Sequence, residues 1–145
     1  MLTHLKEKEE KIEQIITKLA EESANGKPIV VEGKKDERAL RILGVTGLIM
    51  TVKTGGKSFL EATAEIENLG AREVILFFDF DRRGEEGTLR IQHNLERSKI
   101  KINVLFWCNL RALVGREMQC IESLTSYLGT LKKKTSDNKT ENIPR

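Results

Sequence analysis

Hydrophobic residues recur along the chain in two alternating patterns, one with helical spacing and one as short continuous runs. Spacings of three and four residues predict helices over 5–22, 36–43, 58–69, 85–97 and 110–128. Short apolar runs predict strands over 29–31, 48–52, 73–78 and 102–106. The run from Val74 to Phe78, five consecutive apolar residues, is typical of a central parallel strand that is buried on both faces. In the helix that follows it, Leu89, Ile91 and Leu95 are candidate core positions.

The order of these elements is one helix followed by four strand–helix units. This alternation predicts an α/β fold, with a central four-stranded parallel sheet and helices on both faces. We expect an amphipathic helix over 1–26 that packs on the domain, a core over 27–110, a C-terminal helix over 111–130 and a polar, flexible tail over 131–145. In such a sheet, functional side chains collect beyond the C-terminal ends of the strands.

The composition narrows the class of protein. Aromatic residues make up 5% of the chain, too few for an extended base-stacking platform. No apolar run approaches the roughly 20 residues that span a bilayer, and residues 1–10 are too charged for a secretory signal, so we expect a cytoplasmic protein without a membrane segment. A zinc site is not expected, because the cysteines and histidines lack close spacing: Cys108, Cys120, His4 and His93.

The formal net charge of +3 comes from the end of the chain. Residues 132–145 contain five basic and two acidic residues, which accounts for the whole excess. The rest of the chain is formally neutral, so it has no global basic field for nucleic acid. Binding of a polyanion would therefore need a local cluster, a metal ion or this basic segment.

Two of the predicted strands end in carboxylates followed by glycine. Glu32-Gly33 follows the run 29–31, and Asp79-Phe80-Asp81 follows the run that ends at residue 78. Asp79 and Asp81 point the same way while the chain is extended, and a divalent cation relieves the repulsion between close carboxylates. Glu32 can bind metal or act as a general acid or base. The alternative is that these acids cap turns and helix starts.

Basic residues flank both acidic motifs: Lys34, Lys35, Arg38, Arg82 and Arg83. They are placed to hold phosphates near a metal, and the alternative is a solvated helix face that Asp36 and Glu37 balance. The segment Thr-Gly-Gly-Lys-Ser at 54–58 is not a P-loop, because residue 51 is threonine instead of glycine. We expect it to form a turn beside the site that offers amides to a phosphate.

The two acidic motifs, in this order and at this spacing, resemble the Toprim family. This domain is shared by type IA and type II topoisomerases, bacterial primases, OLD-type nucleases and the nuclease that matures 5S ribosomal RNA. Residues 31–36, Val-Glu-Gly-Lys-Lys-Asp, are similar to that nuclease and to small stand-alone Toprim proteins. Residues 79–85, Asp-Phe-Asp-Arg-Arg-Gly-Glu, are similar to the topoisomerase form. The resemblance covers roughly 27–110 and implies a Rossmann-like Toprim fold.

The resemblance implies a cofactor and a substrate class. Asp79 and Asp81 would bind one or two Mg²⁺ ions, for which Mn²⁺ could substitute, and Glu32 would be a further ligand or the general acid or base. Glu85 would be an additional acid, and Lys34, Lys35, Arg82 and Arg83 would contact phosphates. The substrate would be RNA or DNA, alone or within a ribonucleoprotein assembly.

The chain also departs from the larger members of the family. Topoisomerases use a tyrosine on another domain, and bacterial primases carry a zinc module; neither is expected here. We therefore expect a stand-alone, nuclease-like protein that acts on phosphodiesters with a two-metal type of site. One alternative is a non-catalytic binding module for nucleic acid or ribonucleoprotein that retains the metal site. Another is a phosphotransfer domain in which Asp79 is the nucleophile.

Overall fold

A central parallel sheet organises the protein. The computed structural model describes residues 2–52 and 58–141. The strands are β1 (Ile29–Val31), β2 (Ile49–Thr51), β3 (Glu73–Leu76) and β4 (Lys101–Asn103), and all pair in parallel in the order β2-β1-β3-β4. This confirms the predicted α/β class and four-stranded parallel sheet.

Register places β1 at the centre of the sheet. Ile29 lies opposite Ile49 of β2 on one side and opposite Ile75 of β3 on the other, while Glu73 of β3 pairs with Lys101 of β4. All three residues of β1 are fully buried. The sequence Ile-Val-Val suits this position because β-branched side chains pack well on a pleated surface.

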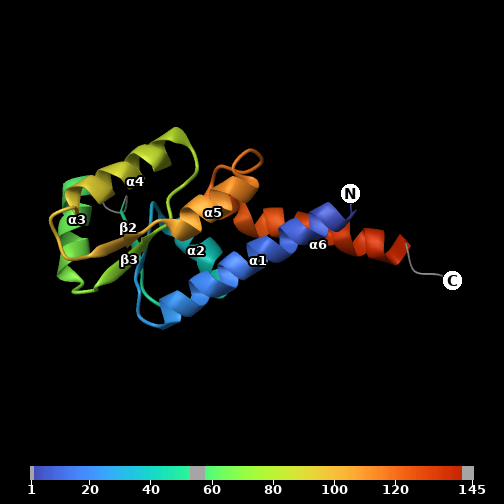
Figure 1. Cartoon of the computed structure of the whole chain (residues 1–145), viewed down its shortest axis with the longest axis horizontal. Coiled ribbons are helices and arrows are strands. Elements are labelled where there is room, and N and C mark those ends of the chain that lie inside the picture. Colours follow the sequence, from blue (N-terminus) through green and yellow to red (C-terminus); the bar gives the residue numbers. More distant parts are fainter. Residues whose placement is uncertain (1, 53–57, 142–145) are drawn as a thin grey trace.

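Helices surround the sheet and form most of the chain. Their bounds are α1 (Leu2–Ala24), α2 (Lys34–Ile42), α3 (Phe59–Asn68), α4 (Arg82–Asn94), α5 (Leu105–Val114) and α6 (Leu124–Glu141), with a 3₁₀ turn, η2 (Ile121–Ser123), directly before α6. In Figure 1, α3 and α4 lie to one side of the strands, and α1, α2 and α5 lie to the other. None of the helices in the described parts of the chain is long and apolar enough to cross a membrane.

The two faces of the sheet form two separate hydrophobic cores. Val30, Leu76 and Phe78 pack with residues of α3 and α4. Val31 and Phe77, which alternate with them, pack with residues of α1, α2, α5 and α6. Alternation of side chains along a strand accounts for this division, because successive residues point to opposite faces. The prediction of helices on both faces is confirmed.

α1 and α6 pack together and extend away from the sheet (Figure 1). The buried hydroxyl of Thr135 donates to Glu9 Oε1 at 3.2 Å, and Lys132 Nζ lies 3.0 Å from Glu13 Oε1. Leu131 is also buried in this contact region. The helix therefore continues to Glu141, through residues for which the sequence predicts a flexible tail. Its side chains pack against α1, which a pattern within α6 alone does not reveal.

The C-terminal third of the chain differs in other ways from the prediction. The strand expected over 102–106 ends at Asn103, and α5 begins at Leu105, whose amide donates to Asn103 Oδ1 at 2.9 Å. The single helix expected over 110–128 is wrong, because α5 ends at Val114 and α6 starts at Leu124. The apolar run over 102–107 has no clear period, so the sequence pattern does not separate the end of the strand from the start of the helix.

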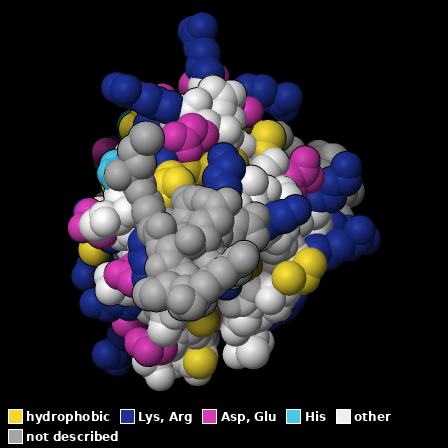
Figure 2. All heavy atoms as spheres, turned by 90° about the vertical axis from the view of Figure 1, so that its right-hand side faces the viewer, with side chains coloured by type: hydrophobic (Ala, Val, Ile, Leu, Met, Phe, Trp, Pro, Cys, Tyr) yellow, Lys and Arg dark blue, Asp and Glu magenta, His cyan; other side chains and the backbone are white. Residues whose placement is uncertain are grey.

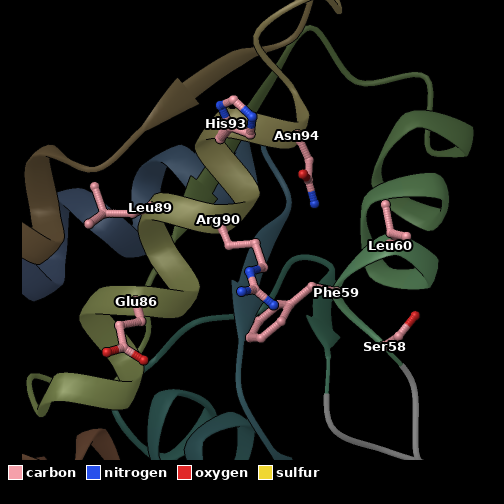
Figure 3. Close-up of a pocket in the computed structure, with 8 residues that line it drawn as sticks. All are labelled: Ser58, Phe59, Leu60, Glu86, Leu89, Arg90, His93 and Asn94. Atoms are coloured by element: carbon pink, nitrogen blue, oxygen red, sulfur yellow. The ribbon is translucent and has the colours of Figure 1, made fainter.

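The predicted core positions of α4 are partly correct. Ile91 and Leu95 are buried, but Leu89 is 59% exposed. Leu89 instead lines an open groove between α3 and α4, whose volume is about 710 Å³. Figure 3 shows Arg90 and Phe59 facing each other across this groove, with the guanidinium carbon 5.6 Å from the ring centroid.

Candidate metal centre

The candidate site lies where the connections of the sheet change direction. The chain leaves β1 through α2 towards β2, and leaves β3 through α4 towards β4, on the opposite side. The C-terminal ends of β1 and β3 therefore form the topological switch point, where open α/β sheets bind ligands. Glu32 follows β1 and Asp79 follows β3, so the fold brings these two predicted residues together.

Three carboxylates meet at this point. Glu32, Asp36 and Asp79 each offer one oxygen, and these oxygens all lie within 4.8 Å of one another. Glu32 and Asp36 are only 5% and 7% exposed, and Asp79 is half-buried. Such a set of oxygen ligands matches the preference of hard cations such as Mg²⁺.

Asp36 is held by the first turn of α2. Its Oδ2 accepts a hydrogen bond from the backbone N–H of Gly33 at 3.1 Å, an interaction of the capping-box type. Sequence reasoning missed Asp36 as a site residue, because it considered this carboxylate only as a charge that balances the neighbouring basic residues. The available signal was its place in Glu-Gly-x-x-Asp: a carboxylate in the first turn of a helix faces back towards the preceding strand end.

The segment that carries Asp79 is fixed by neighbours from α4, from α5 and from the loop before η2. Trp107 of α5 donates its indole N–H to the carbonyl oxygen of Phe78 at 2.9 Å. The amide of Phe80 donates to the carbonyl oxygen of Gln119 at 2.7 Å. In α4, a Cβ at Gly84 would overlap the carbonyl oxygen of Asp79, so only glycine permits this close approach. Trp107 is buried and anchors α5 to this segment.

The carboxylate and the backbone amide of Asp79 each form a hydrogen bond with another part of the chain. Its Oδ1 accepts a hydrogen bond from the amide of Ile121, the first residue of η2, at 2.8 Å. The backbone amide of Asp79 in turn donates to Glu32 Oε2 at 3.3 Å. The contribution of η2 was also missed, because the sequence pattern predicted one continuous helix through this segment.

Burial and crowding of negative charge set the electrostatics of the site. Burial, a hydrogen bond with the Glu32 carboxyl group and the charges of Asp36 and Glu32 raise the pKa of Asp79 to about 7, against the opposing effect of the Ile121 amide. Burial also raises the pKa of Asp36, helped by the charges of Glu32 and Glu122. A bound cation would offset this repulsion and favour the ionised carboxylates.

Asp81 takes a different position from its neighbour Asp79. It is the N-cap of α4, and its Oδ1 accepts from the amide of Gly84 at 2.8 Å. It does not belong to the three-carboxylate group found among residues 2–52 and 58–141. Glu85, the other candidate acid, lies 3.2 Å from Arg111, whose guanidinium stacks on Trp107 at 4.9 Å.

The predicted phosphate-binding residues are all exposed. Lys34 and Lys35 begin α2, while Arg82 and Arg83 begin α4. Arg82 also pairs with Glu86, with 3.2 Å between Nε and Oε1. The turn expected at 54–56 lies outside the described residues.

Two other surfaces formed by described residues differ from the carboxylate cluster. The groove of Figure 3 lies between α3 and α4, and its lining includes none of the three clustered carboxylates. On the face at the free ends of α1 and α6, lysine and arginine side chains stand around the rim with acidic side chains between them (Figure 2).

Comparison with known proteins agrees with this geometry. A profile of the Toprim domain matches residues 26–106. The chain belongs to the Toprim family. This domain is a metal-binding fold associated with nucleic acids, and the acidic cluster lies inside the matched region.

Archaeal relatives extend the similarity beyond the Toprim domain itself. The chain is 31% identical over 126 residues to a UPF0292 protein of Methanosarcina barkeri, covering 87% of this chain and 86% of the relative. It is 38% identical over 120 residues to a UPF0292 protein of Methanocaldococcus jannaschii, covering 82% and 91%. A solved structure of an Aquifex aeolicus protein shares the fold, with a TM-score of 0.61 at 24% identity over 76% of this chain and 94% of that one.

Proposed function

We propose that this Toprim protein binds Mg²⁺ through Glu32, Asp36 and Asp79 and cleaves phosphodiester bonds of nucleic acid. The observation that carries the proposal is the convergence of three carboxylate oxygens within 4.8 Å at the switch point of the sheet. The donor set fits the ion, because it consists of hard oxygen ligands whose mutual repulsion a cation relieves. Bound Mg²⁺ would supply stabilisation of the charge that develops on the phosphate.

The residues of the site divide the remaining work. Asp36 and Asp79 are held by backbone donors and serve as fixed ligands. Glu32 serves as a ligand or as the general acid or base that moves a proton during cleavage. Asp81 is proposed as an additional ligand: its Oδ1 caps α4, and a carboxylate has a second oxygen that can bind a cation.

Exposed cations at the starts of α2 and α4 support a polyanionic substrate. Lys34 and Lys35 come two and three positions after Glu32, and Arg82 and Arg83 come directly after Asp81. Such side chains bind phosphate groups and position the strand without reading its sequence. The proposed substrate is RNA or DNA, free or within a ribonucleoprotein assembly.

The test is cleavage of labelled single-stranded, duplex and hairpin RNA and DNA by the purified protein with Mg²⁺ or Mn²⁺. We expect cleavage that EDTA stops, and that Glu32→Gln abolishes while the exposed-acid control Glu67→Gln retains it. Metal binding without cleavage of any of these substrates would refute the nuclease proposal.

A non-catalytic binding module is the second candidate. It is motivated by the formal neutrality of the chain before residue 132, which offers no general attraction for a substrate strand beyond the local site. In that case, Asp79→Asn would weaken Mg²⁺-dependent retention of RNA or DNA on a filter, and the wild-type protein would leave the strand intact.

A further inference from the structure

The segment that precedes α6 contacts the metal centre from outside the matched Toprim domain. The domain match ends at residue 106, whereas Gln119 and Ile121 bond directly to the Asp79 segment. We propose that the backbone amide of Ile121 is a positioning group for the metal centre, which fixes the orientation in which Asp79 presents its carboxylate. This inference rests on the proposed metal site.

Two hydrogen bonds of opposite direction join this segment to the Asp79 segment. Ile121 N–H donates to Asp79 Oδ1 at 2.8 Å, and Gln119 C=O accepts from the amide of Phe80 at 2.7 Å. The pair restrains both translation and rotation, so the contact has a defined register. It is anchored by the side chain of Ile121, which is fully buried in the core shared by α1, α5 and α6.

The consequence for Asp79 is a loss of rotational freedom. With Oδ1 bound to a backbone donor, rotation of the carboxylate would break a charge-assisted hydrogen bond. The second oxygen is therefore already oriented, and binding of a cation does not incur the conformational entropy cost of ordering the carboxylate. Hydrogen bonds to metal-ligating carboxylates generally matter in this way, and their loss costs about 10- to 100-fold in metal affinity.

The same segment also contacts the helix of the second ligand. Asp36 belongs to the first turn of α2, and α2 packs against η2. η2 thus bonds to Asp79 directly and packs against the helix that carries Asp36. Because η2 continues directly into α6, the long C-terminal helix is linked to the site through the three residues of η2.

A proline substitution isolates the proposed hydrogen bond. Ile121→Pro removes the N–H, and the backbone tolerates it, because Ile121 is the first residue of η2 and Cys120 is extended, with φ −105° and ψ 130°. Ile121→Ala is the matched control, since it loses the buried side chain but keeps the N–H. We expect the Kd for Mn²⁺ to rise by about tenfold or more in Ile121→Pro relative to Ile121→Ala.

Hydrogen exchange of the wild-type protein gives a second readout that does not depend on the variants folding. If the contact of Ile121 with Asp79 strengthens metal binding, then by linkage bound metal must strengthen that contact. Saturating Mg²⁺ should therefore slow exchange of the Ile121 amide. Equal Mn²⁺ affinities of the two variants, or an Ile121 amide whose exchange ignores Mg²⁺, would overturn the inference. In both results the wild-type protein still binds metal, whereas absence of binding by the wild type would overturn the proposed metal site as well.

Discussion

The carboxylate of Glu32 accepts a hydrogen bond from the backbone amide of Asp79, at 3.3 Å, although the two residues lie 47 positions apart. The bond joins the ends of β1 and β3, the two strands on either side of the switch point. The carboxylates are therefore held together by the fold before any cation arrives. Because these carboxylates repel one another, the free energy of unfolding of the metal-free protein depends on whether Asp79 is protonated.

The first prediction concerns the pH dependence of that stability. The pKa of Asp79 is raised from 3.8 to about 7 in the folded state. Between these values the folded protein holds a proton that the unfolded chain has released, so this residue's contribution to the free energy of unfolding falls as pH rises from about 4 to about 7. The side chain of Asp79→Asn is neutral throughout this range, so its free energy of unfolding should fall less steeply with pH. Urea unfolding at several pH values, in the presence of EDTA, measures this. Identical pH slopes of the free energy of unfolding for the two proteins would contradict a raised pKa of Asp79.

Gly84 is predicted to be required for the position of Asp79. A Cβ at this residue would overlap the Asp79 carbonyl oxygen, so Gly84→Ala should displace the backbone and lower the free energy of unfolding by about 1–3 kcal/mol. Gly129→Ala is the control: it lies exposed in α6, its Cβ would meet nothing within 4 Å, and it should raise stability by about 0.5–1 kcal/mol. Urea unfolding measures both, and a harmless Gly84→Ala would show that the close approach is unimportant.

Trp107 is predicted to stabilise the Asp79 segment through its indole N–H. Trp107→Phe keeps a buried ring but leaves the carbonyl oxygen of Phe78 without its 2.9 Å donor, which should cost about 1–3 kcal/mol. The variant should also bind Mn²⁺ more weakly, because the same indole lies 3.4 Å from the Asp79 carbonyl oxygen. Calorimetry and urea unfolding test the two effects. Unchanged metal affinity would separate the indole from the site.

The lysines at the start of α2 are predicted to contact phosphates. Lys34→Gln/Lys35→Gln should weaken binding of RNA or DNA and reduce the slope of log K against log salt by about 2. Lys133→Gln/Lys134→Gln removes the same charge from exposed positions of α6, and it should leave the slope closer to that of the wild type. Fluorescence anisotropy at several salt concentrations measures the slopes. An equal loss in both variants would indicate non-specific attraction instead of a site.

The strands and the strand-end acids of the Toprim core were predictable because their signals are local. Ile29–Val31 is a short β-branched run, bounded by Pro28 and by the Glu32-Gly33 pair, and its bounds match the prediction. Parallel pairing then places everything that follows β1 and β3 at one edge of the sheet. Glu32 and Asp79 could therefore be brought together without knowledge of side-chain geometry.

The finer geometry of the site depends on where the chain stops being extended. Asp79 and Asp81 would share a direction in a strand, but β3 ends at Leu76 and α4 begins at Arg82. The turn between them directs Asp81 to cap α4. Asp36, which the sequence did not indicate as a site residue, joins the cluster from α2. The contact from Ile121 depends on a chain reversal after α5 that no local periodicity reports.

The metal centre is tested most directly by the affinity for Mn²⁺, measured by calorimetry for the wild type, Asp79→Asn and Glu85→Gln. We expect the wild type to bind Mn²⁺ and Asp79→Asn to bind it about tenfold or more weakly. Glu85→Gln should bind like the wild type, because Glu85 lies outside the cluster and pairs with Arg111. Absence of binding by the wild type, or equal losses in the two variants, would contradict the assignment of Glu32, Asp36 and Asp79 as the metal centre.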